Sequence, residues 1–389
     1  MKKPVVKIIS YFLLISLLSG CLGGREVNDL EIVIGMGLDS TENPDSILLT
    51  AQVVDVSQLG LSGGSGKDSK AYWNVSTSAS TIFEAIRQVT HKTGNRLFVS
   101  HCKIFVYGRE LAEEGLYKHF DFVLRAMEMR LTTLILIADD KASDVLDAKP
   151  QTEELPAMNI DKLVKSYGYT SHLYAVTLKD FASRLISKTK SPMAPIIRVI
   201  EEGDEKDIYI TGLAIFNGDK MVGELNMDET RGLLWVINEV ESGVLLVPTP
   251  EGTGTAVFEI GSAKGKVKPE ITEDGRVIMH IDIKLNASLS EQTSTEKLAD
   301  PQKFEILQDG MSEVVTQEIM AAYEKSVKTS SDIFGFGDLV QKRYKKRWDE
   351  YKDIWDEVYK TIELDINVKS KITKADLLNN PVAYKARVE

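Results

Sequence analysis

Residues 277–289, Val-Ile-Met-His-Ile-Asp-Ile-Lys-Leu-Asn-Ala-Ser-Leu, form the most regular stretch of the sequence. Every second residue from Val277 to Leu289 is apolar, and most residues between them are polar. A period of two predicts one long β-strand that buries a single face. Asp274-Gly275 precedes this stretch and predicts a turn that leads into the strand.

A long helix and a closing strand are predicted further along the chain. The helix is indicated by apolar residues at helical spacing and the strand by a second alternation. The helical positions are Phe304, Leu307, Met311, Val314, Val315 and Ile319, and the strand positions are Ile362, Leu364, Ile366 and Val368. Antiparallel strands beside long helices are typical of an α+β fold with largely antiparallel or mixed sheets, rather than of a doubly wound parallel sheet.

Between these two elements we expect another helix, which begins near Asp338 with a capping box to Gln341. It would carry one apolar stripe at steps of three and four residues, from Tyr344 through Trp348, Tyr351 and Trp355 to Val358. An ordinary core helix is the main interpretation of this stripe, and an exposed docking stripe is the alternative.

The rest of the chain predicts mixed α and β structure. Strands are expected at 29–38, 48–56, 103–107 and 132–138, helices after Thr81, near 157–167, 178–188 and 228–238, and a hairpin at Asn217-Gly218. Proline- and glycine-rich breaks at 191–195 and 248–255 suggest domain boundaries. We therefore expect three mixed α/β domains, at 21–194, 195–255 and 256–389, after a signal peptide at 1–20.

The first twenty residues have the pattern of a secretory signal. Three lysines precede an apolar run of 13 residues, Ile8 to Gly20, which is too short to span a bilayer comfortably. Leu18-Ser-Gly-Cys21 follows the pattern of a bacterial lipobox, which predicts a lipid on the Cys21 thiol and cleavage before it. Residues 1–20 hold three lysines and no acid, so their removal leaves 44 basic and 58 acidic residues and a net charge of −14. Such a chain would be repelled by anionic headgroups, and the covalent lipid would have to anchor it.

Composition and motifs argue against several classes of function. The acidic net charge does not suit a nucleic-acid partner, and two cysteines cannot build a disulfide scaffold or a multi-cysteine metal site. Gly60-Leu-Ser-Gly-Gly64 matches the nucleophile pattern G-x-S-x-G around Ser62, but the sequence after it cannot form the helix that a nucleophile elbow needs. The five histidines show no spacing typical of a metal site. We therefore expect no catalytic residues, no cofactor and no metal.

One charged cluster stands out against the acidic background. Lys342, Arg343, Lys345, Lys346 and Arg347 are five basic residues within a span of six. A solvated helix face is the simpler interpretation. The alternative is a contact with an acidic partner subunit or with the anionic membrane.

Several blocks of the sequence resemble the Ger(x)C family, the lipoprotein C subunits of spore germinant receptors. They are residues 21–39, 80–87 with 97–108, 212–225 with Glu229-Thr-Arg-Gly232, and Asp332-Ile-Phe-Gly-Phe-Gly337 with Trp348 and Trp355. The resemblance implies a three-domain α+β lipoprotein on the outer face of the spore inner membrane. It also implies assembly with two integral-membrane subunits, A and B, into a nutrient receptor.

Two other classes of function remain as alternatives. A solute-binding lipoprotein of a membrane transporter would have two α/β lobes, a hinge and a cleft between the lobes. A surface hydrolase would rest on Ser62 alone.

Overall fold

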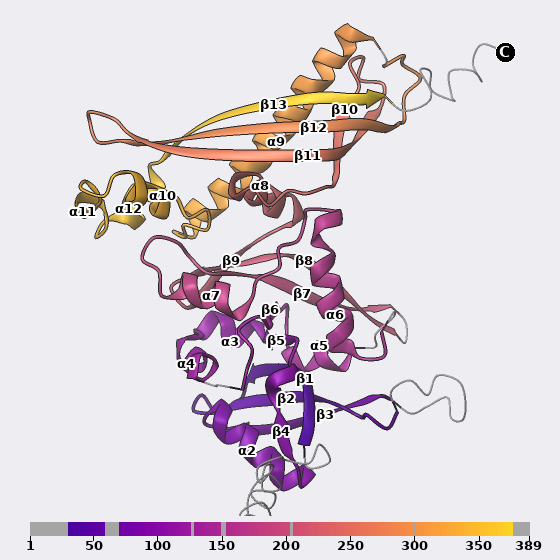
Figure 1. Ribbon diagram of the computed structural model, residues 1–389, viewed down its shortest axis with the longest axis vertical. Coiled ribbons are helices and arrows are strands. Elements are labelled where there is room, and N and C mark those ends of the chain that lie inside the picture. Colours follow the sequence, from indigo (N-terminus) through magenta and orange to yellow (C-terminus); the bar gives the residue numbers. More distant parts are fainter. Residues whose placement is uncertain are drawn as a thin grey trace, which may run out of the picture.

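The computed structural model describes residues 30–58, 70–125, 128–148, 153–202, 205–298 and 300–375. These residues form two β-sheets with helices on their faces, one sheet below the other in an elongated molecule (Figure 1). The expected α+β class, with mixed sheets, is confirmed.

The N-terminal sheet has nine strands in the order β3-β2-β1-β5-β6-β7-β8-β9, and β4 pairs with the start of β1. The four central strands β1, β5, β6 and β7 run parallel, and the strands on both sides of them are antiparallel. The bounds are β1 Leu30–Ser40, β2 Ile47–Val54, β3 Tyr72–Ala79, β4 Arg96–Phe98, β5 Ile104–Tyr107, β6 Leu134–Ala138, β7 Met193–Glu202, β8 Glu205–Asn217 and β9 Lys220–Leu225. The expected strands in this half and the Asn217-Gly218 hairpin are present, whereas the parallel centre was not foreseen.

Helices cover both faces of this sheet, which is why its central strands are apolar along their whole length. Helices α2, α3, α4 and α7 share one buried cluster with the sheet, and α5 and α6 share the other. Their bounds are α2 Ile82–Thr93, α3 Arg109–Glu114, α4 Tyr117–Arg125, α5 Ala142–Asp147, α6 Pro156–Lys165 and α7 Leu178–Leu185, with 3₁₀ turns at Val99–His101 and Ser166–Tyr169. Thr81 caps α2 and Thr177 caps α7 through their side chains.

The C-terminal sheet has the order β10-β11-β12-β13. Its strands are β10 Val244–Pro248, β11 Thr255–Ile271, β12 Val277–Gln292 and β13 Glu363–Ala375. The helices are α8 Met227–Ile237, α9 Pro301–Lys328, α10 Phe336–Arg343, α11 Trp348–Tyr351 and α12 Trp355–Lys360. The expected strand over 277–289 is β12, and its apolar positions are buried against α8 and α9. Strand β13 lies parallel to β12, so the chain crosses the sheet through α9–α12 before it returns.

The single helix expected from Asp338 is wrong. The chain forms three short helices instead, because the backbone leaves helical geometry at Tyr344 (φ −120°, ψ 50°) after α10. The first helix begins at Phe336, before Asp338, and the side chain of Asp338 contacts Thr189 and Lys190 instead of capping a helix. The aromatic stripe is nevertheless a core feature, since Trp348, Tyr351 and Trp355 are buried.

Strand pairing and side-chain hydrogen bonds connect the two halves of the molecule, in addition to the covalent chain. The boundary expected at 194/195 falls inside β7, which pairs with β6 before it and β8 after it. Arg184 of α7 donates from Nη1 to the carbonyl oxygens of Ser191 and Ile333, both at 3.0 Å. The division into three domains stays a prediction.

Candidate functional site

Two of the residues singled out in the sequence lie outside the described residues. They are Cys21, the expected lipid attachment site, and Ser62 of the G-x-S-x-G pattern. Leu30, the first described residue, pairs with Arg96 of β4, and β4 lies with α2 at the lower end of the molecule in Figure 1. Among the described helices, none has the length and apolar character that a membrane span requires.

The basic cluster lies at the other half of the molecule. Lys342 and Arg343 form the last turn of α10, where the helix dipole favours cations. Lys345, Lys346 and Arg347 follow in the turn before α11. The cluster therefore spans the end of α10 and the turn after it, and it does not lie on the single helix that the sequence predicted from Asp338.

The cluster is exposed, apart from half-buried Arg347. One continuous helix would let Lys345 and Lys346 pair with Asp349 and Glu350 at i,i+4, but the chain leaves helical geometry between α10 and α11. Arg347 instead approaches Glu350 at 3.5 Å and donates to the Tyr351 hydroxyl at 3.1 Å. In the described part of the chain, Lys345 and Lys346 have no ion-pair partner, so both ammonium groups are available to a partner.

A buried carboxylate fixes the segment that carries the cluster. Asp332 accepts hydrogen bonds from the backbone N–H groups of Gly335 (2.7 Å), Phe336 (3.0 Å) and Gly337 (2.8 Å), and from Nε1 of Trp355 (3.1 Å). Burial raises the pKa of Asp332 to about 6 against these donors, so the group is still an ionised acceptor at neutral pH.

The two glycines in this segment have separate steric reasons. Gly335 takes a left-handed conformation with φ +73°. A Cβ on Gly337 would come within 2.9 Å of Trp355 Nε1 and 2.8 Å of the Thr189 carbonyl oxygen. Both glycines of Asp332-Ile-Phe-Gly-Phe-Gly337 are therefore needed where the Asp332 carboxylate, the start of α10 and the Trp355 indole pack together.

This segment also contacts the N-terminal half. Asp338 accepts hydrogen bonds from the Thr189 hydroxyl and, at 3.2 Å, from Lys190 Nζ. Burial alone would raise the pKa of Asp338, but the Thr189 hydroxyl and the Lys190 ammonium outweigh it and lower that pKa. The basic cluster therefore sits on a segment that is held from both halves of the molecule.

An open groove of about 1500 Å³ lies in the N-terminal half. Its walls are α2, α4 and the β1–β2 turn, with Phe83, Phe122, Arg87 and Arg125 among the lining residues. It does not lie between two lobes. Within the described ranges, no group of three His, Cys, Asp or Glu side chains is arranged to hold a metal ion.

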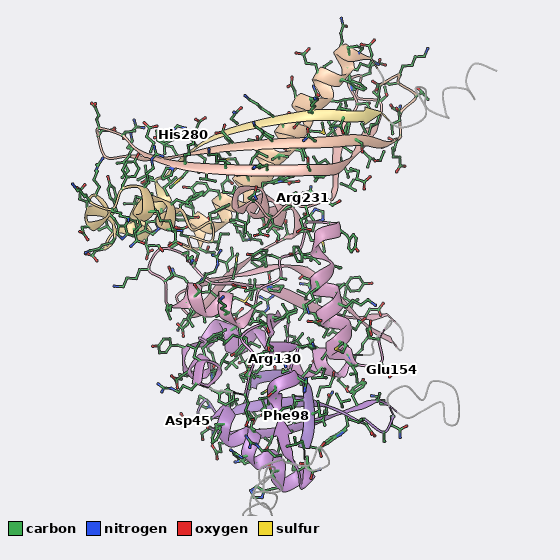
Figure 2. The ribbon with its side chains drawn as sticks, in the orientation of Figure 1. Asp45, Phe98, Arg130, Glu154, Arg231 and His280 are labelled. Atoms are coloured by element: carbon green, nitrogen blue, oxygen red, sulfur yellow. The ribbon has the colours of Figure 1, made fainter. Side chains whose placement is uncertain are left out.

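His280 and Cys102 both have structural environments. His280 lies on β12 between two carboxylates, with Nδ1 2.7 Å from Asp365 and Nε2 2.7 Å from Glu270 (Figure 2). Cys102 is a free, buried thiol, and burial raises its pKa to about 12.

One buried polar cluster was missed by the sequence reasoning. Arg231 of α8 pairs with Glu318 of α9 through Nε (2.9 Å) and Nη2, and Trp235 Nε1 donates to the same carboxylate at 2.8 Å. Figure 2 labels Arg231 between the two sheets. An arginine inside the apolar run of a predicted helix was the available signal.

Comparison with known proteins agrees with this architecture in both halves. Residues 23–199 match the family described as "Spore germination protein N-terminal domain", and 211–375 match "Spore germination B3/ GerAC like, C-terminal". Spore germination protein KC of Bacillus subtilis (strain 168) is 25% identical over 94% of this chain and 95% of its own. Spore germination protein B3 of the same organism is 24% identical over 94% of this chain and 96% of its own.

A solved structure has the same fold. The crystal structure of the GerBC protein superposes with a TM-score of 0.57 and 19% identity, over 87% of this chain and 97% of that one. Two sheets with these helices, matched by the two family models over 23–199 and 211–375, define a spore germination protein. The chain belongs to the Ger(x)C family.

Proposed function

We propose that this chain is the lipid-anchored, non-catalytic C subunit of a nutrient germinant receptor. It would sit on the outer face of the spore inner membrane and act by assembly with two integral-membrane subunits, A and B. The observation that carries this proposal is the match of both family models, in order, over most of the chain.

The position of the proposed anchor indicates which end of the molecule would lie nearest the membrane. Eight residues lie between Cys21 and Leu30, and the nine peptide steps that join the two residues can span at most about 30 Å. The end with β4 and α2 would therefore lie nearest the membrane, and α10–α12 would lie further out (Figure 1). This arrangement supports a protein partner over lipid for the basic cluster.

The test is co-purification from detergent-solubilised spore membranes. The wild-type subunit should recover the A and B subunits of one receptor, and the Cys21→Ala variant should lose the lipid and most of the assembled complex. A wild-type subunit that is recovered without either membrane subunit would refute the proposed role.

The basic cluster is proposed as one contact within this assembly. Lys345→Glu combined with Lys346→Glu reverses two exposed charges and spares Arg347, which holds the Tyr351 hydroxyl. We expect normal folding and weaker assembly, most clearly at low salt. Normal assembly and germination at normal protein level would exclude this contact.

A solute-binding lipoprotein remains a second candidate because the groove between α2 and α4 is large enough for a small molecule. Its position within the N-terminal half, and not between two lobes, favours the receptor subunit. Calorimetric titration of the purified chain with amino acids and sugars decides between them, since a solute-binding protein would give saturable heats.

A further inference from the structure

The outer face of the C-terminal sheet carries several lysines. Side chains alternate along β11, β12 and β13, and the inner set packs on α8 and α9. The outer set is exposed or half-buried. Six lysines belong to the outer set: Lys264, Lys266, Lys268, Lys284, Lys369 and Lys371.

Three of these lysines are direct neighbours across the strands. Lys264 of β11 is in register with Lys284 of β12, and Lys284 is in register with Lys369 of β13. Neighbouring strands are about 4.8 Å apart, so the three lysine side chains lie side by side in one row. Like charges directly opposite each other destabilise a sheet. This row of lysines therefore adds no stability to the isolated fold.

Several acidic groups on the same face are engaged by other side chains. Toward the β11–β12 turn, Glu270 and Asp365 hold His280, and Glu363 pairs with Arg276. Asp282, the acid nearest the row, is in register with Lys266 and accepts a hydrogen bond from Asn367 at 2.9 Å, while Glu259 and Glu291 lie two or more rows beyond Lys284. Within the described residues, none of the six lysines has an ion pair or a side-chain hydrogen bond. The central row therefore has no paired counter-charge, in a protein whose mature net charge would be −14.

We propose that this lysine face, centred on the row Lys264–Lys284–Lys369, docks a carboxylate-rich protein surface of a partner subunit. The inference rests on the proposed function, because it assigns the receptor assembly a second contact, distinct from α10–α12. Rows along a strand repeat about every 6.7 Å and strands about every 4.8 Å, so the face presents a rigid array that several carboxylates can match. Charge complementarity of this kind sets orientation and association rate.

A protein surface fits better than a bilayer because of the position of the face. The C-terminal sheet lies at the far end of the molecule from β4 and α2, the end that would lie closest to the anchor (Figure 1). The apolar side chains on the outer side of this sheet, exposed Val244 and Leu246 of β10 with half-buried Val257 and Ile278, lie two or more rows away from the central lysine row.

The test compares two triple variants with equal changes in net charge. Lys264→Glu/Lys284→Glu/Lys369→Glu reverses the row, and Lys118→Glu/Lys141→Glu/Lys179→Glu reverses three exposed lysines of the N-terminal half. In co-purification from spore membranes, the row variant should lose most of the bound A and B subunits, and the control should retain them. Row and control variants that retain the partners equally would overturn the lysine-face contact while the proposed function stands. A wild-type chain that recovers no partner would overturn both.

Two further measurements separate misfolding and lipid binding from docking. The single variant Lys284→Glu places a carboxylate between two lysines, so its Tm should equal or exceed that of wild type while its partner recovery falls. A lower Tm together with lost recovery would assign the row to folding and reject the proposal. Sedimentation of a chain that begins at Arg25 with phosphatidylglycerol vesicles tests the bilayer, and binding that disappears when the row is reversed in that chain would reject a protein partner.

Discussion

At the scale of single residues, Asp332 shows how one side chain determines the course of the chain around it. Its carboxylate receives three backbone donors and an indole donor, and these come from two helices, α10 and α12. An unsatisfied buried donor costs about 1–3 kcal/mol. The arrangement is therefore stable only while the carboxylate is present.

We predict that Asp332→Ala lowers the free energy of unfolding by at least about 3 kcal/mol, because four buried donors lose their acceptor. Urea denaturation of the purified chain measures the change. The matched control is Asp300→Ala, which removes an exposed cap whose carboxylate accepts from Gln302 N at 2.9 Å at the start of α9. That variant should lose only about 1 kcal/mol. Equal losses would show that Asp332 acts as an ordinary cap.

His280 gives a prediction for pH. Asp365 and Glu270 stabilise its imidazolium form and raise its pKa above the ordinary value of 6.5. A raised pKa means that the folded state holds the proton more tightly than the unfolded chain. This contribution to stability is complete below the unfolded pKa and is lost as pH rises through the folded one. The free energy of unfolding should therefore fall more steeply above pH of about 6.5 in wild type than in His280→Gln.

Denaturant titrations over this pH range measure the difference, and an NMR titration of the ring measures the pKa directly. His91→Gln, an exposed histidine on α2, controls for the substitution. Parallel stability profiles in wild type and His280→Gln would contradict the prediction.

At the scale of elements, α8 and α9 are joined by charge as well as by packing. Arg231 also donates from Nη1 to the Val244 carbonyl oxygen at 2.8 Å, so the guanidinium links α8 to β10 as well as to Glu318. A Cβ on Gly232 would stand 2.0 Å from the Glu318 carbonyl oxygen, so only glycine allows this close approach. The block Glu229-Thr-Arg-Gly232 thus has a packing role between two helices.

We predict that Glu318→Ala destabilises the protein by about 3–5 kcal/mol, because it leaves the Arg231 guanidinium buried without a counter-charge. The double variant Arg231→Met/Glu318→Leu should recover most of that loss, since it removes both charges and fills the space. Chemical denaturation of the single and double variants tests the pair. A double variant no more stable than Glu318→Ala would indicate that packing, and not the unpaired charge, causes the loss.

The elements also show why sequence patterns succeed in some places and fail in others. Strand β12 and helix α9 were predictable because each buries one face along its whole length, and that burial imposes a strict period. The segment after Asp338 was not predictable, because short helices that turn back onto one core also place aromatics three and four residues apart. The parallel pairing of β13 with β12 depends on a crossover that no local pattern encodes.

The same limit applies to the candidate surfaces. The basic cluster was visible because its five residues are consecutive or nearly so in sequence. The lysine face was not, because its central row joins residues 264, 284 and 369 from three strands, and only the strand register brings them together.

At the scale of the whole molecule, the proposed function makes the lipid on Cys21 the expected attachment to the membrane. We predict that a chain beginning at Arg25 folds and stays in the supernatant when membranes without the A and B subunits are pelleted. The physical reason is that its net acidic surface is repelled by anionic lipid and no acyl chain remains. The full chain with its lipid is the control and should pellet. Pelleting of the shortened chain would point to a second membrane contact.

Because β13 pairs with β12, the edge of β12 stays open until late in the synthesis of the chain. Strand β12 spans 16 residues, and its partner follows only after α9–α12 have been made. Until Glu363–Ala375 has emerged from the ribosome, a nearly complete chain carries a long open edge, and such edges recruit strands from other chains. A premature stop codon before Glu363 should therefore yield aggregates instead of a shorter working subunit, and holdase chaperones should bind the nascent chain longest at this stage of translation and export.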